Sequence, residues 1–174
     1  MDPLRYPIGS FQPVESFRME QQLAYEDQLL RFAPLLRETV RDWRPNQLDT
    51  PYRPGGWTVR QVIHHLADND MNAILRFKRA LTEEQPTAGT YREADFAELA
   101  DYTADVELSI TLLESLHSRF IILLRSLQPS HFDRTFVSPT HGRMTLAVAA
   151  QRLVWHNHHH LAHIAALKQR MGWQ

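Results

Sequence analysis

Four long stretches of this chain place apolar residues at the three- and four-residue spacing of an amphipathic helix. They extend from about Val14 to Trp43, Thr58 to about Leu81, about Asp105 to Leu127, and Thr145 to about Met171. Helices of this length each bury one face against the others. The pattern predicts an all-α fold, a four-helix bundle that forms a single domain over residues 1–174.

Local signals mark the expected helix ends. Thr58 and Gln61 have the spacing of a capping box, and Gly172 follows the last helix as a typical C-terminal stop. Pro34 removes a backbone donor inside the first helix, so we expect it to kink or split that helix. A small β-hairpin is expected within residues 131–145, where turn residues interrupt the pattern.

A long polar connection joins the second and third helices. Residues 83–103 contain Pro86 and Gly89 and only a short helical pattern around Glu93 to Leu99. Connections of this length in compact domains are often lids or binding loops, and disorder is the competing interpretation. We therefore expect any site between the helices to open beneath this segment.

Composition narrows the classes of function. The net charge is -1 with mixed signs, whereas nucleic-acid-binding proteins usually carry a basic field, so no nucleic-acid partner is expected. The chain has no cysteine, which leaves His, Asp and Glu as metal ligands and excludes a cysteine nucleophile. No apolar run reaches the ~18 residues that a membrane span needs. The expected location is the cytoplasm, with no membrane partner.

The fourth helix carries five histidines within the stretch VWHNHHHLAHI, Val154 to Ile164. A helical wheel places His156 and His160 in or beside the apolar stripe, one turn apart on one face. His158 and His159 fall on other faces and are expected to be solvated, whereas His163 lies at the boundary. Two histidines at i and i+4 can bind one metal ion, although buried histidines that only hydrogen-bond in the core are the simpler alternative.

The second helix offers His64 and His65, and periodicity alone does not choose between them. His65 shares a polar stripe with Gln61 and Asn69, whereas His64 lies nearer Asp68. A third histidine from this helix would strengthen the metal hypothesis. At this level the choice stays open.

Five separate motifs resemble one family. These are YPIG from Tyr6, YRPGGWTVRQVIHHLADNDMNA from Tyr52, RFKRALTEEQPT from Arg76, LHSRF from Leu116 and WHNHHHLAHI from Trp155. Together they resemble the YfiT branch of the DinB-like four-helix-bundle proteins. Members of this branch are named metal-dependent hydrolases, and the branch is related to bacillithiol transferases. The resemblance covers nearly the whole chain.

The resemblance implies one zinc or nickel ion per chain, held by three histidines. Carried over motif by motif, the ligands are His65, His156 and His160, and the last two are the pair that the helical wheel selects independently. From the residues themselves, Gln61, Asp68, His117 and His163 are candidates for contacts that orient these ligands. The resemblance also implies a homodimer. No catalytic residue beyond the metal ligands is predicted.

Three neutral imidazoles leave coordination positions for water or substrate, which is typical of catalytic metal sites. The preferred hypothesis is a metal-dependent S-transferase that moves a small thiol of the bacillithiol type onto an electrophilic small molecule. The alternative is a metal-dependent hydrolase that uses activated water. A second alternative is a non-enzymatic binding protein with a closed metal site, for which Asp68 is the nearest fourth ligand.

Overall fold

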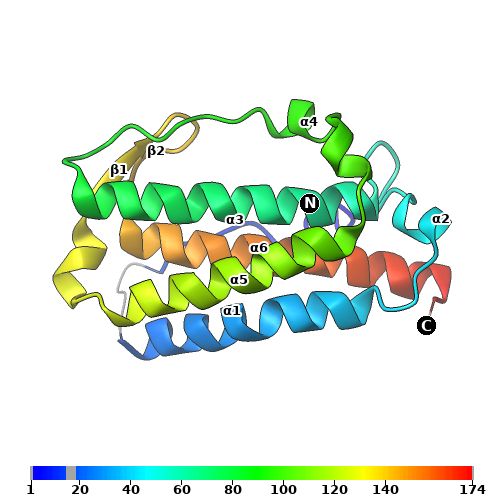
Figure 1. Cartoon of the computed structure of the whole chain (residues 1–174), viewed down its shortest axis with the longest axis horizontal. Coiled ribbons are helices and arrows are strands. Elements are labelled where there is room, and N and C mark those ends of the chain that lie inside the picture. Colours follow the sequence, from blue (N-terminus) through cyan, green and yellow to red (C-terminus); the bar gives the residue numbers. More distant parts are fainter. Residues whose placement is uncertain (1, 15–18, 174) are drawn as a thin grey trace.

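The computed structural model describes residues 2–14 and 19–173, in which four long helices pack side by side (Figure 1). They are α1 (Met19–Thr39), α3 (Val59–Thr82), α5 (Val106–Arg125) and α6 (Leu146–Met171). The predicted four-helix bundle is confirmed. The predicted start of the first helix near Val14 precedes residues 15–18, which lie outside the described residues.

The bundle has two helices that run in each direction. In Figure 1, α1 and α6 run one way, and α3 and α5 both run the other way. Two consecutive helices can be parallel only if the chain returns along the length of the bundle between them, and the segment between α3 and α5 does so (Figure 1). Around the bundle, α1 and α3 each contact both α5 and α6.

Capping residues define the helices as the sequence predicts. The Thr58 hydroxyl accepts a hydrogen bond from the Gln61 backbone N–H (3.1 Å), and the Gln61 side chain accepts one from the Thr58 N–H (3.0 Å). Gly172 ends α6 in the left-handed region at φ 64°. Pro34 does not split α1. It is exposed, so the carbonyl that loses its partner one turn earlier, that of Leu30, lies on the solvent side.

Short elements connect the four helices: α2 (Pro45–Leu48), α4 (Glu93–Phe96), η1 (Ala100–Thr103), η2 (Pro129–Asp133), β1 (Thr135–Ser138) and β2 (Gly142–Thr145). The strands β1 and β2 form the predicted antiparallel hairpin, in which Phe136 pairs with Met144. The connection after α3 is tied to this hairpin, because the Ala88 N–H donates to the Val137 carbonyl (2.9 Å) and the Val137 N–H donates to the Pro86 carbonyl (2.9 Å).

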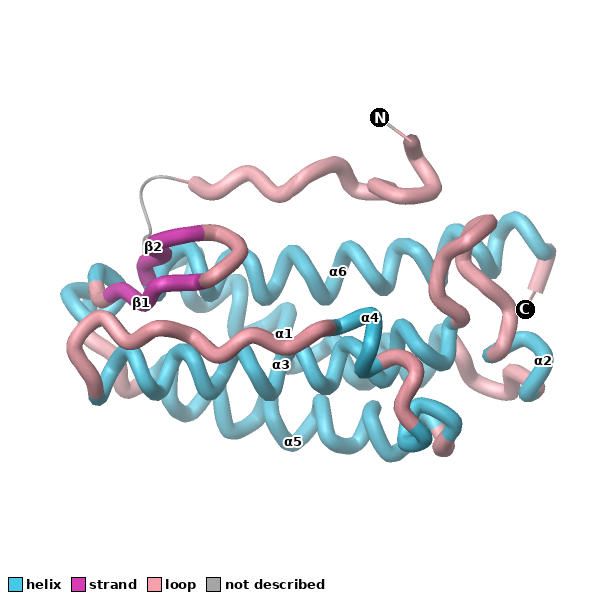
Figure 2. Tube along the Cα trace, turned by 90° about the horizontal axis from the view of Figure 1, so that it is seen from above, coloured by secondary structure: helices cyan, strands magenta, loops and turns pink. Residues whose placement is uncertain are grey.

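The N-terminal segment, residues 2–14, lies along the outside of α6 (Figure 2). Gln151 fixes its end, since the side chain accepts from the Val14 N–H (2.7 Å) and donates to the Val14 carbonyl (3.2 Å). Nearer its start, Tyr6 and Phe11 pack against the rings of His159 and Trp155. This segment covers a second face of α6 in addition to the face within the bundle.

The apolar core consists of two clusters. One contains Val59 to Ala67 of α3 and Leu161 to Leu167 of α6, and the other contains Ile74 to Ala80 and Leu146 to Val154 of the same helices. The intervening turns of α3 and α6 carry buried polar side chains instead, including Asp70 and Asn157. The bundle therefore has a polar layer between two hydrophobic ones.

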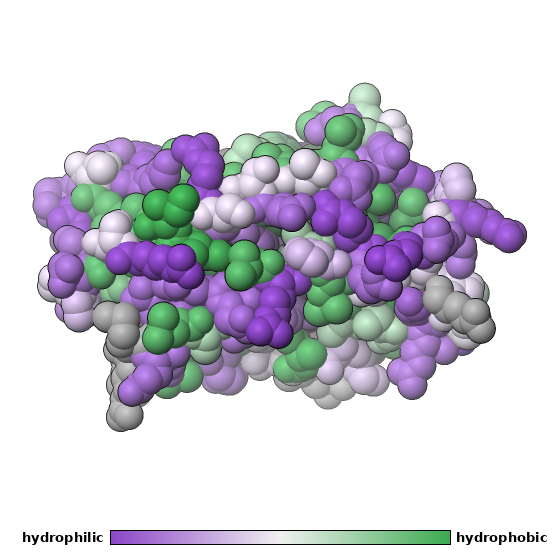
Figure 3. All heavy atoms as spheres, turned by 60° about the horizontal axis from the view of Figure 1, so that its bottom comes forward, coloured by the Kyte–Doolittle hydropathy of each residue, from purple (hydrophilic) through white to green (hydrophobic). Residues whose placement is uncertain are grey.

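On the outside of α1 and α5, apolar side chains are interspersed with charged ones (Figure 3). The larger exposed apolar residues there are Leu23, Leu30, Leu35, Leu108, Leu112 and Ile122. None of the described helices is long and apolar enough to cross a membrane.

Candidate metal centre

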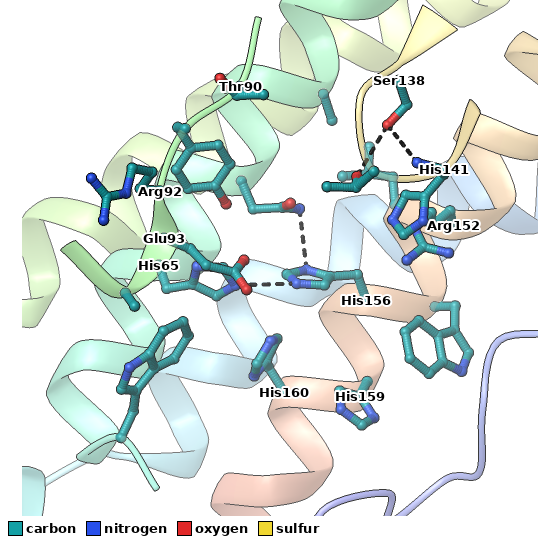
Figure 4. A pocket seen from close by; sticks show the side chains of 18 of the residues that line it. His65, Thr90, Arg92, Glu93, Ser138, His141, Arg152, His156, His159 and His160 are labelled. Atoms are coloured by element: carbon teal, nitrogen blue, oxygen red, sulfur yellow. Dashed lines mark hydrogen bonds between the residues drawn. The ribbon is translucent and has the colours of Figure 1, made fainter. Parts of the chain in front are cut away.

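Three histidines from two helices meet at the boundary of the polar layer (Figure 4). His65 comes from α3, and His156 and His160 come from successive turns of α6. One ring nitrogen of each lies within 4.8 Å of the corresponding nitrogens of the other two. The structure thus brings together His156 and His160, which the helical wheel pairs, and His65, which the family resemblance adds.

The geometry of these nitrogens suits a divalent metal ion. The Nε2 atoms of His65 and His156 are 3.2 Å apart. Two imidazoles that bind one zinc ion at ~2.0–2.1 Å with tetrahedral angles place their nitrogens roughly 3.3 Å apart. The observed separation therefore needs little adjustment to accept an ion.

The three imidazoles are neutral at pH 7. Burial lowers the pKa of His65 to about 4. Burial and the neighbouring histidines lower the pKa of His156 and of His160 well below the ordinary value of 6.5. Neutral imidazoles keep the lone pairs that a metal requires, and three of them without an ion would repel each other if protonated.

The structure distinguishes His65 from His64. The His64 ring lies 2.7 Å from the Ser109 hydroxyl and 3.2 Å from the Ala104 carbonyl, on the side of α3 that faces α5 and η1. His65 faces α6 and packs on Trp57, with ring centroids 4.7 Å apart. His64 is therefore engaged away from the cluster, and the ambiguity left by periodicity is removed by the position of α6.

His163 fixes the orientation of His160. Its Nε2 lies 3.1 Å from the Arg5 carbonyl, which can only accept, so Nε2 carries the proton. Burial lowers the pKa of His163 to about 4, so the ring is neutral and its Nδ1 is an acceptor. That Nδ1 lies 3.4 Å from Nδ1 of His160, which therefore donates and leaves its Nε2 lone pair available for an ion.

A buried polar chain leads to His156. The amide nitrogen of Asn69 lies 3.1 Å from His156 Nδ1 and 3.2 Å from Asp70 Oδ1. Asp70 is fully buried, and its Oδ2 lies 2.6 Å from His117 Nε2 and accepts a hydrogen bond from the Asn157 amide (2.8 Å). His117 thus reaches a proposed ligand through two intermediate residues rather than directly.

The other two predicted contacts lie elsewhere. Gln61 completes the cap of α3 and donates to the Ala97 carbonyl (3.0 Å), and Asp68 accepts a hydrogen bond from Tyr102 (2.7 Å). A cavity lies above the three histidines, and neither Gln61 nor Asp68 is among the described residues that line it. Within the described part of the chain, the cluster consists of three histidines and no carboxylate.

The expectation that His158 and His159 are solvated is wrong. His159 is buried, stacks on Trp155 at 4.6 Å and lines the cavity. His158 is half-buried, with its ring 6.2 Å from Phe32 of α1. The wheel assumed one buried stripe, whereas the N-terminal segment and α1 cover further faces of α6.

A cavity of about 810 Å³ opens above the three histidines. Its walls come from α3, α6, the hairpin, the N-terminal segment and the connection before α4, so the expected pocket beneath residues 83–103 is present. Trp57 forms part of the wall beside His65 and His160. The volume is in the range of sites that hold small organic ligands.

Tyr91 and Glu93 of the connection also line the cavity. The Tyr91 ring lies 6.5 Å from that of His65, and its buried hydroxyl has no hydrogen-bond partner among the described residues. Burial and the charge of Glu93 raise the pKa of Tyr91, so the hydroxyl remains a donor. Sequence reasoning missed both residues, because only the path of the connection brings them over α3.

Comparison with known proteins agrees with this architecture. The family model described as DinB superfamily matches residues 28–164. YfiT of Bacillus subtilis, provisionally named a metal-dependent hydrolase, is 48% identical over 172 residues, which cover 98% of this chain and 97% of YfiT. A protein of Bacillus mycoides with the same provisional name is 43% identical over 99% of this chain and 100% of its own length.

Solved structures show the same fold. The structure of YfiT from Bacillus subtilis, described as having an unusual four-helix bundle topology, superposes with a TM-score of 0.96 at 47% identity and covers 99% of both chains. TT2238, a four-helix bundle protein, superposes with a TM-score of 0.56 at 19% identity over 87% of this chain and 98% of its own. At that identity the second likeness concerns the fold alone.

Proposed function

This chain belongs to the DinB superfamily, and we propose that it is a metal-dependent enzyme in which His65, His156 and His160 hold one zinc or nickel ion. The observation that carries this proposal is the meeting of three neutral imidazoles at the base of a cavity large enough for a small organic substrate. The relatives that share this architecture are provisionally named metal-dependent hydrolases. An ion held this way supplies open coordination positions and lowers the pKa of a bound water or thiol.

The surrounding residues would prepare the site for this chemistry. His163 orients the His160 imidazole with its Nε2 lone pair free, so this ring need not reorganise when an ion binds. The Asn69 amide lies against Nδ1 of His156 and helps to hold that ring in place. Trp57 shields the cluster from solvent on one side. The Tyr91 hydroxyl is positioned to donate a hydrogen bond to an oxygen of the substrate or of a leaving group.

We infer that the nucleophile is a small thiol of the bacillithiol type and that the reaction is S-transfer to an electrophile. The paired His117 and Asp70 lie beneath the cluster and are not among the described residues that line the cavity. They cannot reach a nucleophile there as an acid–base pair. A thiol, with an ordinary pKa near 8.5, needs far less help from a base than water does. Because the chain has no cysteine, the thiol would arrive as a substrate.

Hydrolysis is the second candidate, and Glu93 favours it. This exposed carboxylate lines the cavity and is not paired with an arginine among the described residues, so it could accept a proton from water. A closed, purely structural site would need a fourth ligand. The candidate considered for it, Asp68, is engaged by Tyr102 instead.

Metal content tests the ligand assignment. We expect about one zinc or nickel per chain by mass spectrometry of tag-free protein, and loss of the ion in His65→Ala, His156→Ala and His160→Ala. His158→Ala is the matched control, because it removes an imidazole from the same helix without changing the cluster. Retention of the ion in any of the three variants, or equal loss in the control, would refute the assignment.

Two reactions separate the candidates. S-transfer predicts that the metal-loaded protein accelerates the reaction of small thiols with haloalkyl electrophiles, whereas hydrolysis predicts cleavage of activated esters without a thiol. His156→Ala should abolish whichever reaction occurs. A full complement of metal with neither reaction, across a panel of thiols and esters, would instead favour the non-enzymatic interpretation.

A further inference from the structure

The charges that line the cavity are unbalanced. Five arginines (Arg5, Arg53, Arg76, Arg92 and Arg152) line it, together with two carboxylates, Glu93 and Asp95. Arg92 is paired with Asp95 at 2.7 Å. The chain as a whole has 20 acidic and 19 basic residues, so this excess of positive charge is a local property of the cavity.

Three of these arginines, Arg53, Arg76 and Arg152, are half-buried without a carboxylate partner among the described residues. Arg53 is engaged by its own neighbours, because it donates to the Tyr52 hydroxyl (3.2 Å) and to the Pro54 carbonyl (3.1 Å). Arg152 of α6 lies over the Phe11 ring at 5.3 Å, and burial lowers its pKa. Arg76 of α3 reaches the Gly89 carbonyl at 3.3 Å, but its Nε is buried and has no hydrogen-bond partner among the described residues. A buried guanidinium N–H without an acceptor is costly, which indicates that an acceptor from outside the chain belongs there.

Arg76 and Arg152 both lie toward the end of the cavity that the hairpin forms. Burial lowers the pKa of His141, which lies in the turn between β1 and β2, and the charges of Arg152 and Arg76 lower it further. Figure 4 shows Arg152 with His141 and Ser138 at the side of the cavity toward the hairpin. The other described arginines without carboxylate partners, outside the cavity, are all exposed to solvent: Arg44, Arg119, Arg143 and Arg170.

We propose that Arg76 and Arg152 form a subsite that binds an anionic group of the substrate, a carboxylate or a phosphate. Arginine suits this role because its planar N–H groups can bind two oxygens of one anion. Arg152 precedes His156 by one helical turn, so the subsite lies about 6 Å along α6 from the three histidines. The reacting atom of the substrate would therefore lie at the histidines and its anionic group toward the hairpin.

This inference rests on the proposed function, because it takes the cavity above the histidines to be the substrate site. The experiment therefore measures anion binding rather than turnover. The two kinds of anionic group are probed separately, with succinate for a carboxylate and inorganic phosphate for a phosphate. Each is titrated into the protein while tryptophan fluorescence is recorded. Trp57 and Trp155 line the cavity and should report occupancy. Succinamide serves as the neutral analogue of succinate, and sodium chloride keeps the ionic strength constant.

We expect Arg76→Gln and Arg152→Gln each to weaken binding of the better anion roughly tenfold or more, as for loss of a charge-assisted hydrogen bond. Arg119→Gln is the matched control, since it makes the same charge change at an exposed site on α5. Lysine at either position should retain part of the affinity, and circular dichroism verifies folding. If a glutamine variant unfolds, the comparison of its lysine variant with Arg119→Lys replaces it.

His156→Ala separates this inference from the proposed metal centre. We expect this variant to bind the anion as the wild type does, even if it has lost its ion. Anion binding that disappears in His156→Ala but survives in both arginine variants would place the anion on the metal and overturn the subsite. Equal binding of succinate and succinamide, or no binding of either anion, would overturn it as well.

Discussion

Acidification should destabilise the metal-free protein between pH 7 and pH 5, above the range in which most carboxylates titrate. His65 and His163 are 1% and 2% exposed, and burial lowers the pKa of each from 6.5 to about 4. The unfolded chain binds a proton at each position below about pH 6.5, whereas the folded chain does not until about pH 4. The free energy of unfolding therefore decreases as the pH falls through this window.

The magnitude follows from the two pKa values. Between pH 7 and pH 5, each of these histidines contributes a loss of about 2 kcal/mol, so the pair contributes about 4 kcal/mol. His156 and His160, whose pKa values burial also lowers, act in the same direction. A typical domain has only about 5–15 kcal/mol of stability, so the effect is large.

The assay is urea denaturation of chelator-treated protein, followed by circular dichroism at pH 7, 6 and 5. With a urea m-value of about 2 kcal/mol/M, the midpoint should decrease by roughly 2 M or more. In His65→Gln, which removes one of the buried histidines, the decrease in the free energy of unfolding should be smaller by about 2 kcal/mol, or about 1 M in the midpoint. Equal midpoints at pH 7 and pH 5, or an unchanged pH dependence in His65→Gln, would refute this reasoning.

Three further substitutions test other contacts. Asp70→Ala leaves the buried His117 ring and the Asn157 amide without their shared carboxylate and should lower the free energy of unfolding by about 2 kcal/mol or more in urea at pH 7. His163→Phe keeps an aromatic ring against Tyr52 but removes the acceptor for His160, so metal affinity, measured by competition with a chromophoric chelator, should fall roughly 10–100-fold. Tyr91→Phe removes one hydroxyl and should lower kcat/KM roughly tenfold with metal content unchanged.

Each substitution has a matched control. Asp27→Ala breaks an exposed ion pair on α1 and should cost less than about 1 kcal/mol, so an equal loss at both positions would contradict the role of burial. His158→Phe changes the same helix as His163→Phe without touching the cluster, and equal loss of metal affinity would show that the effect is not specific. Tyr102→Phe removes a hydroxyl outside the cavity, and it should leave kcat/KM as it is.

Much of the fold could be predicted because its signals are local. Thr58 with Gln61 and Gly172 define helix ends through contacts within a few residues, and the hairpin depends on turn residues within one short segment. His156 and His160 could be paired from sequence for the same reason, since their spacing on one helix fixes their relation. The length and polarity of the connection between α3 and α5 predict either a covering segment or disorder, and its residues that line the cavity favour the first.

Features that depend on two distant segments could not be predicted. His64 and His65 differ only in which neighbouring helix each faces, and periodicity does not contain that information. His159 was misassigned because residues 2–14 cover a face of α6 that the pattern marks as polar. The arginines of the cavity are likewise indistinguishable from surface arginines until the connection and the hairpin enclose them.

The hydrogen bond between His163 and the Arg5 carbonyl joins positions 158 residues apart, and it determines which nitrogen of His160 is free. Gln151 and Val14 make a similar contact across 137 residues. A chain that emerges from the ribosome in order cannot form these contacts until α6 has been made. In the proposed function, capture of the ion would therefore be a late event in maturation, and we expect displacement of Arg5 to weaken metal binding without altering any ligand.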